Sequence, residues 1–292
     1  MRPGRGGRVI VPGAKRVAAD PAAGRAREIL IEIDGGIEEV LSVEPAIRAL
    51  RETGGGRFEV TVCAGDEGLL RNHPGVRQVL NRRGWCGGRR FDAWWRLGGE
   101  AGGGRLVDEY ARRLGVEVRD RRPRIYLDSF DLLRIRRFGT WRSGGMRVVI
   151  GAGTDREERA WDEGKWVELC RYLEGRLGAS VIQVGRRGKR FLGVGRDLIG
   201  KLTGREVATV LRNSDLLVGV NNSWRHLAGA VGSRAVLLAG SASEASELES
   251  EGFCAVRGES AVKDIAIEAV LDGVASAAGC DSLADMEQVM CA

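Results

Sequence analysis

The sequence is poor in aromatic residues, proline and histidine, and these shortages exclude several classes of protein. Aromatic side chains make up 5% of the chain and do not interleave with basic residues along any predicted strand. Together with the absence of a helix-turn-helix or zinc-finger pattern, this argues against a nucleic-acid-binding protein. The 6 cysteines form no CxxC pair, which argues against a zinc ribbon or a redox motif. His, Cys and carboxylate residues do not cluster at ligand spacing, so we expect no metal site.

Long apolar runs are also missing. The N-terminus is basic but has no apolar core segment, so no signal peptide is visible. No run approaches the length of a membrane span. Scattered cysteines, three of which (Cys63, Cys170 and Cys254) lie among apolar residues, are typical of a reducing compartment. We therefore expect a cytoplasmic protein whose membrane contact, if any, is peripheral to the inner membrane.

Glycine and arginine are abundant instead. The chain has 44 glycines, many in short clusters between apolar runs, which indicates many tight loops. The net charge of +6 comes from arginine, whose planar guanidinium group can donate two parallel hydrogen bonds to a phosphate or a carboxylate. Between Arg112 and Arg137 there are nine arginines against four acidic residues. This stretch is either a solvated connector or a surface that faces an acceptor or a membrane.

The apolar pattern alternates between strand and helix spacing and predicts two consecutive α/β units. Strands are expected at residues 28–34, 58–63, 76–80, 91–97, 147–150, 181–184, 215–220 and 235–239, and helices at 37–51, 66–71, 106–114, 161–176, 204–213 and 262–273. This order implies parallel sheets with right-handed crossovers. We divide the chain into a basic arm (1–27), a first α/β domain (28–140), a second α/β domain (146–260) and a helical segment (261–292).

The most informative stretch is residues 214–232. It reads as a buried strand, a polar corner of good helix N-caps, and a small-residue helix that Gly232 would end. The first N–H groups of a helix have no partner inside it, so such a corner is an anion site. The backbone of Asn222, Ser223 and Trp224 would donate to a phosphate, and His226 lies one turn into the helix. A structural histidine is the alternative reading for His226, and His73 looks structural.

Four stretches together resemble a known family. Residues 29–50 are similar to an opening strand, Gly-Asp-Val/Ile turn and Pro-Ala-Leu helix, and 150–161 to a His-Pro-Gly-Ala to Lys-x-Trp-Pro segment. Leu106–Leu127 looks like a stretch ahead of an interdomain hinge. Residues 214–232 match an Ala-Asp-Leu-x-Val-Gly-Asn-Asp-Ser/Thr-Gly-x-x-His-Leu-Ala signature. In this order they resemble the ADP-heptose:lipopolysaccharide heptosyltransferases of glycosyltransferase family 9.

This resemblance implies a GT-B fold, in which two Rossmann-like domains face each other across a cleft. The donor would bind the C-terminal domain and the acceptor the N-terminal one, with inversion at the anomeric carbon. The family's base is an Asp in the first turn, and Glu39 stands in its place, with Glu38 where the family has Gly. Glu39 is therefore the candidate base. The alternative is that both are first-turn acids that the helix dipole favours.

The resemblance also implies a set of donor-binding residues. They are Gly151, Gly153, Arg159, Lys201, Asn221, Asn222, Ser223, His226, Gly240 and Ser241. Several of them depart from the family pattern, and Gly240-Ser241 stands where the family has Gly-Pro-Thr. Asn221 replaces the signature Asp, Ser223 replaces Gly, and Arg159 replaces Lys. These changes are compatible with phosphate binding, but they weaken the assignment of the sugar.

Three functions remain open. The first is an inverting glycosyltransferase that transfers a sugar from a nucleoside diphosphate sugar to a lipopolysaccharide-core or other glycan or glycolipid acceptor. In the family that the chain resembles, the sugar is heptose and the donor is ADP-heptose. It needs no cofactor beyond its nucleotide-sugar donor. The second is a degenerate GT-B protein that binds a nucleotide or sugar without transfer, which Asn221 and the Glu38-Glu39 shift favour. The third, a nucleic-acid-acting protein, rests on the pI of about 9.2 and on the arginine-rich stretch between Arg112 and Arg137, and its binding would fall steeply with salt.

Overall fold

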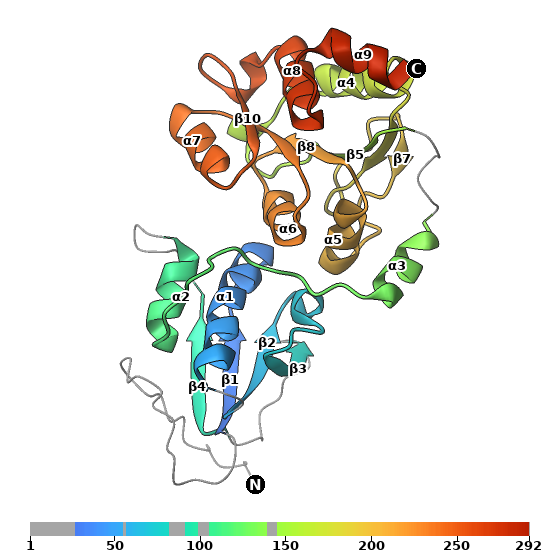
Figure 1. The fold of residues 1–292 in the computed structure, drawn as a ribbon. Helices are drawn as coiled ribbons and strands as arrows, with labels where there is room; N and C mark the ends of the chain where they lie inside the picture. Colours follow the sequence, from blue (N-terminus) through green and yellow to red (C-terminus); the bar gives the residue numbers. More distant parts are fainter. Residues whose placement is uncertain (1–26, 55–56, 82–90, 99–104, 139–144, 292) are drawn as a thin grey trace, which may run out of the picture. The chain divides into compact units, whose positions relative to one another are not determined.

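The computed structural model describes residues 27–54, 57–81, 91–98, 105–138 and 145–291. Its contacts divide the chain into two compact units, Met1–Pro123 and Arg124–Ala292, each built on one parallel sheet (Figure 1). The predicted pair of doubly wound α/β units is therefore confirmed. The arm predicted for residues 1–27 lies outside the described residues, except for Arg27, which begins the first strand.

The first unit is a four-stranded sheet in the order β3-β2-β1-β4, with every neighbouring pair parallel. Its elements are β1 (Arg27–Ile33), α1 (Ile37–Gly54), β2 (Phe58–Ala64), η1 (Glu67–Leu70), β3 (Val76–Asn81), β4 (Ala93–Leu97) and α2 (Leu106–Leu114). The chain places β2 and β3 on one side of β1 and then adds β4 on the other side. Ligands bind parallel sheets at such a reversal, beyond the carboxyl ends of the strands.

Apolar spacing explains the core of this unit. Strand β1 buries a continuous run, Ile29 to Ile31, as a strand covered on both faces does. His73 is buried beside α1, as expected of a structural histidine. Its Nδ1 accepts from the Gly75 N–H at 2.9 Å, so Nε2 carries the proton and donates to Glu44 Oε1 at 3.1 Å.

The second unit is a six-stranded sheet in the order β10-β9-β8-β5-β6-β7, again parallel throughout. Its elements are α3 (Ser129–Arg136), β5 (Arg147–Gly151), η2 (Glu157–Arg159), α4 (Glu163–Gly175), β6 (Ser180–Gln183), β7 (Arg196–Asp197), α5 (Gly204–Arg212), β8 (Leu216–Val220), α6 (Ser223–Val231), β9 (Ala235–Ala239), α7 (Ala242–Ser250), β10 (Cys254–Arg257), η3 (Val262–Asp264), α8 (Ile267–Ala278) and α9 (Leu283–Cys291). Here the reversal falls between β5 and β8. A ligand site is therefore expected beyond the carboxyl ends of these two strands.

The unit boundary lies after Pro123, whereas the sequence suggested residues 140–146. Helix α3 belongs to the second unit because Asp131 forms a buried ion pair with Arg205 of α5. The expected helix at 262–273 is split into η3 and α8, and α8 packs on β8, β9 and β10. Residues 261–291 contain η3, α8 and α9, and their contacts group them with the second unit. Helix α7 and strand β10 were not predicted.

Candidate functional site

The corner between β8 and α6 is held in place by one side chain. Asn222 is the N-cap of α6, and its Oδ1 accepts from the Trp224 N–H at 2.9 Å. Its Nδ2 donates to the carbonyl oxygens of Gly151 at 3.2 Å and Gly153 at 3.0 Å. Asn222 thereby ties the end of β5 to the start of α6, across the reversal of the sheet. Because the Trp224 N–H is taken by this cap, the backbone donors expected for an anion are reduced to those of Asn222 and Ser223.

Three cations converge on this corner. Arg159 donates from Nη1 to the Asn221 carbonyl oxygen at 3.1 Å. Arg186 donates from Nη2 to Ser223 Oγ at 3.4 Å, and Lys189 donates from Nζ to the Thr154 carbonyl oxygen at 2.6 Å. Asp155 offsets part of this charge, since Lys189 hydrogen-bonds to it and holds the pKa of its carboxyl below the usual range. Positive side chains and a helix N-terminus in one place make a site suited to a diphosphate.

A carboxylate from α7 organises the other side of the corner. Glu244 Oε1 accepts from Asn221 Nδ2 at 2.5 Å and lies 3.3 Å from Arg159 Nε, while Oε2 accepts from the Gly240 N–H at 2.7 Å. Ser241 caps α7 by accepting from the Glu244 N–H at 3.1 Å. Asn221, Arg159, Gly240 and Ser241, all candidates from the sequence, are therefore brought together around Glu244.

The remaining donor-side candidates have separate surroundings. His226 is half-buried in the first turn of α6. Lys201 donates to Asp197 Oδ2 at 2.7 Å and to its carbonyl oxygen at 2.8 Å, and nothing in the described part of the chain links it to the corner. Side chains of the protein already fill the space beside Gly151 and Gly153. A Cβ at Gly151 would lie 3.1 Å from the Trp224 ring, and one at Gly153 would lie 3.1 Å from Lys189 Cγ.

In the first unit, Glu39 folds back over the start of its own helix. Its Oε2 accepts from the Gly36 N–H at 2.7 Å. Gly35 has a φ of 138°, and a Cβ there would lie 2.4 Å from Glu39 Cδ, so only glycine fits beneath the carboxylate. Glu39 is half-buried beyond the carboxyl end of β1, at the reversal of this sheet.

Two further titratable groups lie at or near this end of the first unit. Burial, with a smaller contribution from Glu67, raises the pKa of Asp66, which follows β2. Burial and then the charge of Glu39 raise the pKa of Tyr110 to about 12, so its hydroxyl keeps its proton. That hydroxyl is buried and has no hydrogen-bond partner within the described residues. A phenol near Glu39 can donate to a carboxylate or to a ligand oxygen.

Sequence reasoning missed several of these groups. Arg186 and Lys189 stand in a basic run directly after a predicted strand, and that position at the carboxyl edge of a parallel sheet was the available signal. Glu244 gave no signal, because α7 was not predicted. Tyr110 lies in the predicted helix at 106–114, and only the structure shows that its hydroxyl is buried without a hydrogen-bond partner among the described residues.

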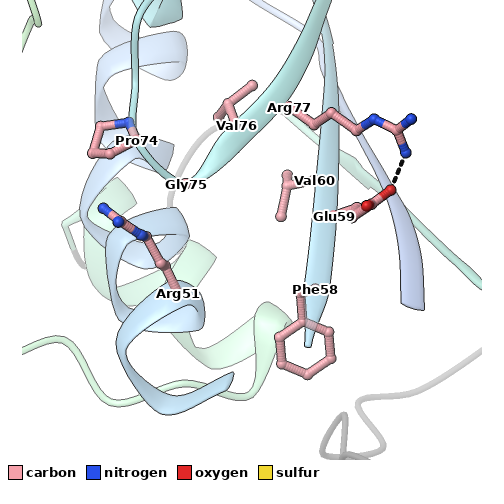
Figure 2. A pocket seen from close by; sticks show the side chains of 8 residues that line it. All are labelled: Arg51, Phe58, Glu59, Val60, Pro74, Gly75, Val76 and Arg77. Carbon is pink, nitrogen blue, oxygen red and sulfur yellow. Dashed lines mark hydrogen bonds and ion pairs between the residues drawn. The ribbon is translucent and has the colours of Figure 1, made fainter. Parts of the chain in front are cut away.

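One cavity lies elsewhere. It has a volume of about 350 Å³ and is lined by Arg51, Phe58, Glu59, Val60, Pro74, Gly75, Val76 and Arg77 (Figure 2). These residues come from the end of α1 and the amino ends of β2 and β3, opposite to the edge that carries Glu39. Arg77 and Glu59 pair at its rim, as the dashed line in Figure 2 shows. The cavity is therefore separate from the catalytic candidate.

Comparison with known proteins defines the class of fold. No protein family model matches the chain, and no curated protein matches it in sequence. Solved structures do match over most of the chain, and glycosyltransferases with a GT-B fold are among them. The fold class and the resemblance expected from the sequence are confirmed at the level of the fold.

Three particular structures illustrate this likeness. A glycosyl transferase family 9 protein from Veillonella parvula DSM 2008 gives a TM-score of 0.69 at 12% identity, covering 87% of this chain and 97% of that one. E. coli ADP-heptose lps heptosyltransferase II gives 0.65 at 14% identity, covering 86% and 98%. E. coli heptosyltransferase WaaC with ADP gives 0.62 at 16% identity, with coverage of 86% and 98%.

Two kinds of feature are absent from the described residues. No group of three or more His, Cys, Asp or Glu residues there is arranged to hold a metal ion. Among the same residues, no helix combines the length and apolarity that crossing a bilayer requires.

Proposed function

We propose that this protein is an inverting glycosyltransferase that uses a nucleoside diphosphate sugar. The observation that carries the proposal is the β8–α6 corner, where Arg159, Arg186 and Lys189 surround the N-terminus of α6. A diphosphate is the leaving group of such a transfer, and cations stabilise it as its charge develops. The likeness to heptosyltransferase structures, including WaaC with ADP, supports the same reading.

In the proposed reaction Glu39 acts as the general base. Its carboxylate takes the proton of an acceptor hydroxyl, and the hydroxyl oxygen bonds to the anomeric carbon. The bond from that carbon to the β-phosphate oxygen breaks, and the nucleoside diphosphate leaves with its electron pair. Arg159, Arg186 and the first N–H groups of α6 hold the departing charge. Attack from the face opposite the leaving group gives inversion.

For the partners, we propose ADP-heptose as the donor and a lipopolysaccharide-core or other glycan or glycolipid as the acceptor. We propose no cofactor, a cytoplasmic location and peripheral contact with the inner membrane. The departure at Asn221 bears on the sugar, whereas Arg159 contacts residue 221 through the backbone carbonyl oxygen, which does not depend on the side chain. Mass-spectrometric identification of a nucleotide sugar that co-purifies with the protein, or is soaked into it, tests the donor directly.

Replacing Glu39 by glutamine tests the catalytic step. The amide oxygen of Glu39→Gln can still accept from the Gly36 N–H, so the helix start is preserved. We expect the transfer rate to fall by about a hundredfold or more while donor affinity is unchanged, because only the base is lost. Glu38→Gln, one residue earlier and exposed, is the matched control and keeps its rate. An undiminished rate for Glu39→Gln would remove Glu39 from the mechanism.

A specific observation favours the alternative, a GT-B protein that binds without transfer. The Glu39 carboxylate is already engaged as a cap of α1, and Asn221 replaces the acid of the family signature. Measurements of donor hydrolysis and of transfer with purified protein separate the two functions. Tight nucleotide binding with neither hydrolysis nor transfer across glycan acceptors would favour the binding protein.

A further inference from the structure

Helix α3 buries an acidic residue and exposes its large apolar residues, which is the reverse of the usual arrangement. Its one buried residue is an acid, Asp131, which is 5% exposed. Its large apolar side chains face solvent instead, with Phe130 71% exposed, Leu133 55% and Leu132 42%. A surface helix of a globular protein normally buries its apolar residues and exposes its acids. The outward apolar side of α3 therefore needs a physical explanation.

An ion pair fixes this orientation. Arg205 of α5 is 4% exposed and donates to both Asp131 oxygens, at 2.8 and 2.6 Å, and to the Tyr126 carbonyl oxygen at 2.6 Å. Asp131 also completes a capping box with Asp128 at the start of α3. Rotating the helix to bury Phe130 would leave the Arg205 charge buried without its partner, which is strongly unfavourable. The apolar residues are thus held outward by the second unit itself.

The same exposed surface is positively charged. Arg134 and Arg136 are exposed, and neither has an acidic partner within the described residues. Arg137 is also exposed and pairs with Glu206. Leu132 and Leu133 lie one turn before Arg136 and Arg137 on the helix. From Ser129 to Phe138 the only acid is the buried Asp131, and the exposed Asp128 lies at the N-cap, at the end of α3 opposite to Arg136.

We propose that the outer face of α3, formed by Phe130, Leu132, Leu133, Arg134 and Arg136, docks on an anionic phospholipid surface. Apolar side chains that enter the headgroup boundary beside arginines that meet anionic lipid are the two contributions that hold interfacial helices. Nucleic acid would use the arginines but leave three large apolar side chains in water. A symmetric dimer through this face would bring two sets of arginines together. The inference builds on the peripheral membrane contact proposed above by naming the surface that makes it, and its test needs no transfer, so it can fail while the transfer reaction stands.

Vesicle binding by the full chain tests the inference. The probe is phosphatidylcholine vesicles with about 30% phosphatidylglycerol, against vesicles of phosphatidylcholine alone. We expect co-sedimentation with the anionic vesicles only. Arg134→Ala/Arg136→Ala should weaken it by about fivefold per arginine, and Phe130→Ser/Leu133→Ser by on the order of tenfold.

A matched variant controls for net charge. Arg171 and Arg257 are exposed arginines of the second unit outside α3, and Arg171→Ala/Arg257→Ala removes the same charge. That variant should bind vesicles nearly as the parent chain does, and thermal unfolding should be unchanged in all three. Equal loss in the control, no binding by the parent chain, or a fall in the unfolding temperature of Phe130→Ser/Leu133→Ser would overturn the proposal. So would a dimer that Phe130→Ser/Leu133→Ser dissociates while vesicle binding persists.

Discussion

A single hydrogen bond shows how this chain differs from the family it resembles. Asn221 stands where the signature has Asp, and its Nδ2 donates to Glu244 Oε1 at 2.5 Å. Asn221 is 6% exposed, so its amide needs a partner, and Glu244 supplies an acid at the same corner. The carboxylate missing from the signature position is thus present nearby on another element.

Replacing Asn221 by the Asp of the family signature is therefore expected to lower the stability of the protein. Asn221→Asp would place a second carboxylate against Glu244 in a largely buried site, where like charges oppose ionisation. Arg159, 3.3 Å from Glu244, would offset only part of this repulsion. We expect a loss of about 2 kcal/mol in the free energy of unfolding at neutral pH. Urea unfolding measures it.

Exchanging the two groups provides the control. In Asn221→Asp/Glu244→Gln the carboxylate lies on residue 221 and the amide on residue 244, so one donor and one acceptor again face each other. We expect most of the lost stability to return. If the single variant is as stable as the parent chain, Asn221 and Glu244 do not act as a pair.

At the scale of elements, the two central strands of the second unit are joined at their starts as well as at their ends. Asp215, just before β8, accepts from Arg147 at the start of β5, through the Arg147 N–H at 2.7 Å, Nε at 3.0 Å and Nη2 at 2.6 Å. The hydrogen bond from the Arg147 side chain is the main reason why the pKa of Asp215 is lowered. The pair reinforces the strand pairing that positions the diphosphate corner.

This pair makes stability depend on pH with a definite sign. Because the folded-state pKa of Asp215 is lowered, its contribution is present above the unfolded value of 3.8 and is lost as pH falls through the folded value. We expect Asp215→Asn to lose about 0.5–1 kcal/mol at pH 7, since the pair is partly exposed, and the difference to vanish in acid. Asp272→Asn, at an exposed site on α8, should show no such change. An equal loss at both pH values would contradict the linkage.

Elements with strong periodicity were predictable and elements defined by distant contacts were not. The helix at Leu106–Leu114 and the strand at Ala235–Ala239 have the predicted bounds, because apolar spacing and flanking glycines define them. Helix α3 was missed because its apolar residues face outward and its orientation depends on Arg205, 74 residues away. Helix α7 is polar, so its position over β9 and β10 leaves no apolar stripe in the sequence.

The candidate site follows the same rule. The corner around Asn222 was predictable, because a strand, an N-cap and a helix start are adjacent in sequence. Arg186, Lys189 and Glu244 come from other elements, and only the order of strands in the sheet brings them together. The local sequence pattern identified the backbone anion donors and the family resemblance identified Arg159, whereas only the sheet topology shows that Arg186, Lys189 and Glu244 lie at the same corner.

At the scale of the whole molecule, each unit carries a different part of the proposed chemistry. The diphosphate corner lies entirely in the second unit, and Glu39 in the first. A ligand that binds only one folded unit stabilises that unit by mass action. A nucleoside diphosphate without a sugar should therefore act on the second unit alone.

Calorimetry of the full chain can test this division. We expect two unfolding transitions, of which ADP raises only one. At a hundredfold excess over its dissociation constant, ADP adds about 2.7 kcal/mol, or about 5–10 °C for a unit of this size. Asp215→Asn should lower the same transition at neutral pH, which assigns that transition to the second unit.

Variants of the corner test which residues hold the nucleotide. Arg159→Ala/Arg186→Ala should abolish the ADP shift, whereas Arg171→Ala should keep the shift. A shift confined to the other transition would place the nucleotide in the first unit, because mass action stabilises only the unit that binds it.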